Sequence, residues 1–536
     1  MGLANRKAYR DRMAAQTLRS PWENSSTFRD GGLPEAQHGP WRLALLGVLF
    51  VFLSLVSWYA NRRIPFVDEA LFSSPVYNTL TAGHFGTTIA DPSIHEANGR
   101  SFPQLSRYTY WCMPMFLYVK IAWHRVAGFS LFSTRLLSIL LGVLVLGAWF
   151  VFLREQFGRS WIVPLALLVI CLDHIFLETA TIARMDILSY CFSAWAYATY
   201  LMLRRRSLNW AALASLSCVI LSGLTHPAGG VTSAGALLFI ALFLDRRALR
   251  VRHLLIGLIP AALGALLLAY HASANPSVFW AQIRASMGHQ NRLAGIGNPL
   301  AGFEFYGQSI VAFFGRTAMS DPTALIKLVI PAFYVICLAV FAAWRPLRTN
   351  RQLQLLTGML GVTLLLMALI DAHGRPSYFI HAWLFPPVVC AAVCYLSWAH
   401  NARIGLALAL GLMFVCSIQT ARTLHVIRAD RYHREYLPVA KFVKQSADSS
   451  ALVMASAEYA FELGFGSGLL DDPMLGFKSG KKADRIVMDE TYRDITNRFE
   501  RTAPEVHAYI VDMLRHEYRE IGKFPNALIY RRRGAE

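Results

Sequence analysis

The sequence predicts a polytopic α-helical membrane protein with a small C-terminal α/β domain outside the membrane. Of its 536 residues, 55% are hydrophobic and 16% are charged, which is too apolar for a soluble enzyme. Long apolar runs recur along the chain, and the run from Leu136 to Leu153 contains no charge. About 20 such residues cross the hydrocarbon core as a helix. From about Thr423 onward the composition becomes mixed, as in a soluble domain.

The chain begins with a basic polar tail, residues 1–40, which contains Arg6, Lys7, Arg10, Arg12 and Arg19. It is too long and too polar for the start of a cleaved signal peptide, and no small-residue cleavage site follows the next apolar run. We therefore expect a cytoplasmic tail, followed by an uncleaved first span at about 41–60.

Ten further apolar runs give a predicted transmembrane domain, residues 41–422, of about 11 spans. After the first span we expect them near residues 134–153, 161–178, 187–203, 208–224, 229–244, 253–270, 325–343, 353–370, 377–398 and 404–421. The connections 61–133 and 271–324 are predicted to be long loops on the outer side.

The segment from Cys112 to Gly128 decides the topology. It is short and carries Lys120, His124 and Arg125, so we expect it to lie along the membrane interface rather than to span. In that case five basic loops all fall on the cytoplasmic side: "REQFGR", "RRRS", "DRRALRVRH", "RPLRTNR" and "HNAR". Most of the formal net charge of +19 is then a topology signal rather than a nucleic-acid site.

The same topology gathers ionisable residues on the outer face. "VDEALF" holds Asp68 and Glu69, and three further motifs lie on this face: "ARMD", "THP" and "DAHGRPSY". Together they contribute the side chains Asp68, Glu69, Arg184, Asp186, His226, Asp371, His373 and Arg375. A one-sided set of this kind at helix ends predicts a site at the membrane surface.

Residues 423–536 are predicted to form the extracytoplasmic domain. "ALVMASAEYAFELG", "DRIVMDE" and "NALIYRRR" have the pattern of strands, and "VHAYIVDMLRHEY" has a helical period. All eight cysteines lie in or beside apolar runs, which predicts packing thiols rather than disulfides.

The ordered set of features resembles a known family. It comprises the apolar first span, the outer "VDEALF", the interfacial segment, "ARMD" at the start of a span and the late "GRPSYFIHAWLFPP". These features resemble the polyprenyl-phosphate-dependent C-type (GT-C) glycosyltransferases, chiefly the branch of protein O-mannosyltransferases and lipid A aminoarabinose transferases. The resemblance covers about residues 41–400. It implies that Asp68 is the catalytic base and that the donor is a sugar on a lipid-linked phosphate.

Glycosyl transfer needs a carboxylate to take the hydroxyl proton and cations to hold the departing phosphate. We therefore assign Asp68 and Glu69 to catalysis, and assign phosphate binding to Arg184, His226, His373 and Arg375. We expect Asp186, Asp173 and Tyr378 to shape the substrate pocket.

Each assignment has a structural alternative. Asp68 could cap the helix that begins at "EALF", and Glu69 could be a first-turn charge or a neighbour that orients Asp68. Arg184 and Asp186 could form an ion pair at a helix start, and the histidines and Arg375 could be interfacial polar residues. "LDHIFLE" puts Asp173 inside an apolar span, where a buried polar network competes with catalysis.

No cofactor is required by this chemistry, although a divalent metal is possible. Candidate ligands are Asp68, Glu69, His84, Asp91 and His95, but their spacing matches no tight metal motif.

The sequence therefore predicts a glycosyltransferase that takes a sugar from a polyprenyl-phosphate donor to a glycan, lipid or protein hydroxyl. We expect it in a bacterial inner membrane, with its site and C-terminal domain in the periplasm and no nucleic-acid partner. The alternatives are a secondary transporter or flippase of a cell-envelope substrate, which predicts repeated halves and midplane charges, and a non-catalytic scaffold that tolerates loss of Asp68. The sugar, the acceptor and the lipid length are not encoded in any motif.

Overall fold

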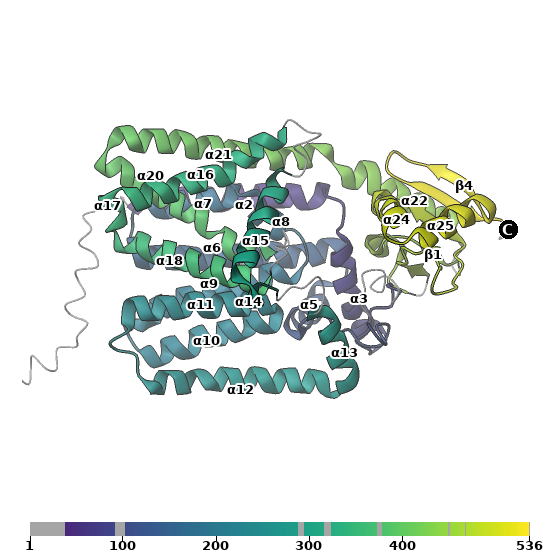
Figure 1. The fold of residues 1–536 in the computed structure, drawn as a ribbon, viewed down its shortest axis with the longest axis horizontal. Coiled ribbons are helices and arrows are strands. Elements are labelled where there is room, and N and C mark those ends of the chain that lie inside the picture. The colour runs from purple at the N-terminus through teal and green to yellow at the C-terminus, as the bar shows by residue number, and fades with distance from the viewer. Residues whose placement is uncertain are drawn as a thin grey trace, which may run out of the picture.

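The computed structural model describes residues 38–91, 102–287, 294–315, 323–371, 378–448, 451–466 and 468–534. Long helices run side by side in one bundle, and a smaller domain lies beyond one end of it (Figure 1). The long helices of the bundle are α2 (His38–Arg62), α6 (Leu131–Phe157), α9 (Met185–Arg204), α10 (Leu208–Thr225), α11 (Pro227–Asp245), α12 (Val251–Ser273), α16 (Thr323–Ala343), α18 (Arg351–Ile370), α20 (Phe385–His400) and α21 (Ala402–Ala429).

Nine helical segments in the described part of the chain are long and apolar enough to cross a membrane. Each coincides with a predicted span, so the chain is a multi-pass membrane protein. The two remaining predicted spans, 161–178 and 187–203, are also helical. The second is α9, whereas the first divides into α7 (Ile162–Leu172) and α8 (His174–Thr179).

The division between α7 and α8 has a local cause. Asp173 ends α7 with an extended backbone, and its side chain accepts a hydrogen bond from Phe176 N at 3.1 Å as the N-cap of α8. An aspartate at this position satisfies a backbone donor that the helix start leaves unpaired. The break is tolerated at membrane depth because Asp173 is buried inside protein.

Shorter helices lie between the long ones. The predicted interfacial segment forms α5 (Pro114–Ala127), whose 14 residues are too few to span. Helix α3 (Val67–Thr81) runs across the direction of the bundle at the same end, near α5 and α13 (Figure 1). The others are α13 (Pro276–Met287), α14 (Ala294–Gly297), α15 (Pro299–Gly315), α17 (Arg345–Arg348) and α19 (Ile380–Trp383).

The C-terminal domain contains a five-stranded sheet in the order β2-β1-β3-β5-β4. Strands β1 and β2 pair in parallel, as do β1 and β3, whereas β5 is antiparallel to both β3 and β4. The strands are β1 (Val453–Met454), β2 (Leu469–Leu470), β3 (Arg485–Met488), β4 (Tyr518–Lys523) and β5 (Leu528–Arg532). The helical segments are the π-helical turn Tyr432–Tyr436, α22 (Leu437–Ser446), the 3-10 turn Ala457–Tyr459, α23 (Ala460–Leu463), α24 (Glu490–Thr502) and α25 (Pro504–His516).

The predicted secondary structure of this domain is partly right. "DRIVMDE" contains β3, "NALIYRRR" contains β5, and the predicted helix is α25. The segment "ALVMASAEYAFELG" is a strand for two residues only, and then becomes a 3-10 turn and α23. Strands β2 and β4 and helix α24 were not predicted.

A joint connects the domain to the helical bundle. Ala90, in the loop after α3, pairs in parallel with Asp471, just after β2. Asp471 N donates to Ile89 O at 2.7 Å, and Asp91 N donates to Asp471 O at 3.0 Å. Ala70 and Leu71 of α3 share one buried apolar cluster with residues of the domain such as Val487. The sheet edge and the apolar cluster therefore join the C-terminal domain to α3 and to the loop that follows it.

Candidate active site

A cavity of about 390 Å³ lies where α3, α5 and the ends of several long helices meet. Its polar lining includes Asp68, Arg184, His226, Asp371 and Tyr378, and its apolar lining includes Leu71, Phe72, Trp111, Met113, Val231 and Ile370. These residues come from segments up to 310 positions apart in the sequence (Asp68 to Tyr378). The outer-face motifs predicted to share one side therefore meet in one cavity.

Asp68 projects from the first turn of α3. Its side chain is 28% exposed and forms an ion pair with Arg184 Nη1 through Oδ2. A carboxylate in a helix first turn is favoured by the helix dipole, which helps to hold this side chain in place. Asp68 is thus accessible from the cavity and has a guanidinium beside it.

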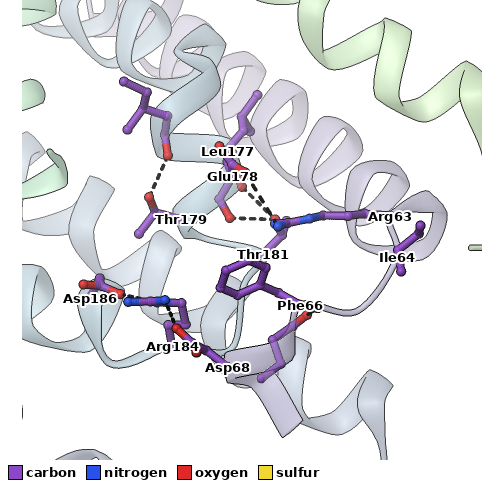
Figure 2. A network of polar contacts seen from close by, with 12 residues as sticks. Arg63, Ile64, Phe66, Asp68, Leu177, Glu178, Thr179, Thr181, Arg184 and Asp186 are labelled. Carbon is purple, nitrogen blue, oxygen red and sulfur yellow. Dashed lines mark hydrogen bonds and ion pairs between the residues drawn. The ribbon is translucent and has the colours of Figure 1, made fainter. Parts of the chain in front are cut away.

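Arg184 occupies the position just before α9 and links two acids. Besides Asp68, it bonds Asp186 through Nε to Oδ2 at 2.9 Å (Figure 2). Asp186 is 1% exposed, and its Oδ1 has no hydrogen-bond partner among the residues that the structure describes. Arg184 therefore forms the ion pair with Asp186 that was the structural alternative, and it also contacts Asp68, with which it was predicted only to share a face.

Phe66 separates this arrangement from a second ion pair. Its ring lies between Arg184, whose Cζ is 5.7 Å from the ring centroid, and Arg63, whose Cζ is 6.0 Å away (Figure 2). Arg63 pairs with Glu178 at 3.6 Å. Cation–π contacts on both faces fix the ring and, through it, the chain entering α3.

Glu69 is adjacent to Asp68 in sequence but is fully buried. Its Oε1 accepts from Arg135 Nε at 3.1 Å and from Ala183 N at 3.1 Å, and its Oε2 accepts from Arg135 Nη2 at 3.0 Å and from Phe66 N at 2.7 Å. Burial acts to raise the pKa of Glu69, but Arg135 and these donors outweigh it, so the pKa lies below its usual range.

Arg135 ties Glu69 to the end of the first span. Its guanidinium also donates to the carbonyl oxygens of Ala60, Arg63 and Ile64. The pair therefore joins α2, α3, α6 and the segment before α9. We call Glu69 and Arg135 the buried clamp. Glu69 is not among the described residues that line the cavity, whereas its neighbour Asp68 is.

His226 and Tyr378 form an aromatic wall of the cavity. Their ring centroids are 4.4 Å apart, and His226 also stacks on His381 at 5.7 Å with an interplanar angle of 18°. His381 is 1% exposed, and within the described part of the chain neither ring nitrogen has a hydrogen-bond partner. His373 and Arg375 lie outside the described residues, so their assignment to phosphate binding stays a prediction.

Asp173 belongs to a different network. Its carboxylate accepts from Gln419 Nε2 at 2.6 Å, Trp383 Nε1 at 3.3 Å and Tyr334 OH at 3.5 Å. It is not among the described residues that line the cavity. The geometry matches the buried polar network that was the alternative to a role in the substrate pocket.

Those candidate metal ligands that the structure describes form no metal-binding group of three. Glu69 is held by Arg135, and Asp91 pairs with Lys481 at 3.0 Å. His95 lies outside the described residues. Across the described ranges, no group of three or more His, Cys, Asp and Glu side chains is arranged to hold a metal ion.

Three residues near the site were missed from the sequence. Arg135 and Phe66 carry no local signal, because their partners are distant in the chain. Lys120 does carry a local signal, because it is the only charged residue in "FLYVKIAW". It is fully buried, donates to Ser73 Oγ of α3 at 2.7 Å, and has its pKa lowered to about 7 by burial.

Solved structures match the chain over nearly its whole length. ArnT from Cupriavidus metallidurans bound to undecaprenyl phosphate is 14% identical, with a TM-score of 0.54 over 92% of this chain and 98% of that chain. ArnT in the apo state gives 13% identity and the same TM-score, over 92% and 97% of the two chains. The chain has the fold of ArnT. This confirms the fold that the resemblance to C-type glycosyltransferases implied.

The Archaeoglobus fulgidus oligosaccharyltransferase in its apo form is a weaker match to this chain, with 12% identity and a TM-score of 0.42 over 88% of this chain and 69% of that one. No protein-family model and no curated protein matches the chain. At these identities the likeness to ArnT concerns the fold, and the chemistry has to be argued from the cavity.

Proposed function

We propose that the protein is a membrane glycosyltransferase that moves a sugar from a polyprenyl-phosphate donor to an acceptor hydroxyl. The observation that carries the proposal is the pair formed by Asp68 and Arg184 on the wall of a largely apolar cavity at one end of the bundle. A carboxylate and a guanidinium are the base and the phosphate ligand that this reaction needs. The ArnT fold supports the same reading, because one ArnT structure holds undecaprenyl phosphate.

The reaction requires little space for the reacting groups. A volume of about 390 Å³ falls in the range of small-molecule sites and suits one sugar phosphate, while the lipid tail stays in the bilayer. The tail confines the reacting carbon to the depth of the lipid headgroups, where Asp68 follows directly after the first span. The apolar lining of the cavity lowers the local dielectric constant and strengthens the charge interactions within it.

In the proposed step the acceptor oxygen attacks the anomeric carbon of the donor. The hydroxyl proton passes to Asp68, the new carbon–oxygen bond forms, and the bond from the anomeric carbon to the phosphate oxygen breaks. The electron pair leaves with the lipid phosphate, whose added negative charge Arg184 stabilises. Atoms and charges balance without a further reactant.

Arg184 has a second consequence for Asp68. While it pairs with Asp68, the guanidinium occupies Oδ2 of the carboxylate. A donor phosphate competes with Asp68 for Arg184 and weakens this pair, so that Oδ2 becomes available to the acceptor hydroxyl when the donor is present. Asp186, which bonds the Nε side of Arg184, keeps the guanidinium in place during the exchange.

The remaining residues are assigned as follows. Glu69 acts by positioning α3 rather than by touching the substrate, and His226 and Tyr378 form the wall beside the phosphate. His373 and Arg375 are proposed as further phosphate ligands. The scheme needs no metal step, although Asp68 and Asp371 are oxygen donors that a divalent cation could use.

We propose that the active site and the C-terminal domain face the periplasm of a bacterial inner membrane, with residues 1–40 as a cytoplasmic tail and 423–536 as the outer domain. The domain would help to bind a glycan, lipid or protein acceptor. A reporter fused after Glu536 should be active only outside the cytoplasm, and a cysteine at Arg205 should be labelled only from inside. The opposite pattern would contradict this orientation.

The decisive experiment supplies purified protein with a panel of polyprenyl-phosphate sugars and measures free polyprenyl phosphate together with glycosylated acceptor. We expect one donor to be consumed with equal release of lipid phosphate. A secondary transporter or flippase, the competing function, would move the donor between leaflets of a vesicle and release no lipid phosphate.

A further inference from the structure

A second cavity lies at the opposite end of the bundle from the active site. It is lined by residues of three basic loops, between α9 and α10, between α11 and α12, and at the start of α18. Eight arginines contribute to it: Arg204, Arg205, Arg206, Arg246, Arg247, Arg250, Arg252 and Arg351. We call it the arginine cavity.

The described lining of this cavity carries far more positive than negative charge. Asp245 is the one carboxylate among its described lining residues. It is already occupied, because Arg204 donates to both of its oxygens at 2.7 Å and Tyr200 OH donates at 2.9 Å. Gathering like charges into one concave site costs free energy unless an anion is present.

Topology alone does not require this arrangement. An excess of arginine in short loops is enough to orient spans, and exposed arginines could point apart into water. Arg345, Arg348 and Arg403 at the same end are exposed and lie outside the cavity. The eight arginines of the arginine cavity differ from these three because they come from separate loops and line the same cavity.

The surroundings of the cavity are those of a lipid site. Its lining residues lie at the starts of the membrane-spanning helices α10, α12 and α18 and at the end of α11, so the cavity lies at headgroup depth. Helix α12 leaves the cavity with an exposed apolar face, on which Val251 and Leu254 are 72% and 68% exposed. Trp210 at the start of α10 is 64% exposed, and tryptophan favours the membrane interface.

We propose that the arginine cavity binds the phosphate headgroup of an anionic phospholipid, whose acyl chains lie along α12. Guanidinium groups recognise phosphate through paired charge-assisted hydrogen bonds. The number of converging arginines suits a headgroup with two phosphates better than one with a single phosphate. The site is separate from the proposed glycosyl transfer and does not depend on it.

The test compares the full-length protein in phosphatidylcholine vesicles with and without cardiolipin, at equal total lipid. Cardiolipin should raise the Tm and be retained by the protein in native mass spectrometry. Arg246→Gln/Arg247→Gln/Arg250→Gln should weaken retention by about fivefold for each arginine, on the order of a hundredfold in total.

The control is Arg345→Gln/Arg348→Gln/Arg403→Gln, which removes the same charge from the same end outside the cavity and should retain cardiolipin as the unmodified protein does. Arg246→Lys/Arg247→Lys/Arg250→Lys keeps the charge and should lose only a few-fold, which separates charge from folding. Equal loss in the Gln triple and its control would overturn the proposal. So would stabilisation by inorganic pyrophosphate in neutral vesicles as strong as that by cardiolipin.

Discussion

The cavity wall around Asp68 and the buried clamp around Glu69 begin at adjacent residues but have opposite environments. Asp68 is 28% exposed, contacts one guanidinium and faces a cavity. Glu69 has no exposed surface and accepts four hydrogen bonds from three residues. A helix turns about 100° per residue, so neighbouring side chains necessarily leave in different directions. The two adjacent carboxylates therefore differ in role. Asp68 is accessible to a substrate, and Glu69 holds in place the helix α3 on which Asp68 lies.

The largest effect is expected at the cavity wall. Asp68→Asn keeps the size of the side chain and removes the base, so turnover should fall by roughly 10²–10⁴-fold with little change in Tm or donor affinity. The measurement is release of polyprenyl phosphate. Glu435→Gln removes another partly exposed acid that is paired with an arginine, Arg431, and should leave turnover unchanged. Near-normal turnover of Asp68→Asn would make Asp68 a helix-cap residue.

Substitutions in the buried clamp should lower the stability of the protein rather than act directly on the chemical step. Glu69→Gln leaves Arg135 buried without its counter-charge and should lower the free energy of unfolding by about 3–5 kcal/mol. The double change Glu69→Gln/Arg135→Met should cost less than the sum of the single changes, because the unpaired charge is gone. Denaturant unfolding in detergent measures both. A normal Tm for Glu69→Gln combined with lost turnover would move Glu69 into the catalytic machinery.

An intermediate effect is expected for Arg184. Arg184→Gln removes a charge-assisted hydrogen bond to the donor phosphate worth roughly 1.5–3 kcal/mol, so donor affinity should fall by about ten- to more than a hundredfold. Arg63→Gln is the matched control, because Arg63 contacts the other face of the same Phe66 ring and is not among the described lining residues of the cavity. Equal losses in both variants would indicate that the Phe66 stack, rather than phosphate contact, sets donor affinity.

A pH-dependence measurement separates burial with a counter-charge from burial without one. Asp471 in the C-terminal domain is buried without an arginine partner, and burial raises its pKa from 3.8 to about 7. Between these values the unfolded chain loses the proton while the folded domain keeps it, so stability should rise as the pH falls from about 7 toward 4. The slope for one proton is at most about 1.4 kcal/mol per pH unit.

For Glu69 the expected pH dependence of stability has the opposite sign. Its folded pKa is below the ordinary value of 4.5, so its contribution is complete above that value and is lost as the pH falls further. Hydrogen exchange of the full-length protein at pH 5 and 7.5, read in β3 and β5, measures the effect in the domain without a change from Glu69, whose contribution is complete at both pH values. Asp471→Asn should flatten the pH dependence there, while Asp472, Asp489 and Glu458, whose pKa values are also raised, leave a remainder of the same sign. An unchanged dependence in Asp471→Asn would assign it entirely to those other groups.

The sequence by itself determined the helical bundle, the position of nearly every span and the two unlike ends. Hydrophobic runs have to be helices in a bilayer because no water is present to satisfy the backbone, and basic loops sort by side whatever the contacts between helices. That sorting was enough to predict that Asp68, Arg184, His226 and Tyr378 share an end, and the cavity that they line bears this out.

Only the tertiary structure decided which of these residues touch. The partners of Glu69 are at positions 66, 135 and 183, and no local pattern signals a contact over such separations. Asp173 looked like a site residue because an acid in an apolar span is costly, but Gln419 from the last long helix of the bundle satisfies it. Strand β2 escaped prediction because its two residues give no periodicity, and pairing with β1 is what makes them a strand. Hydrophobicity is a property of each segment and can be read along the chain, whereas a hydrogen bond or an ion pair belongs to two segments and exists only once packing has brought them together.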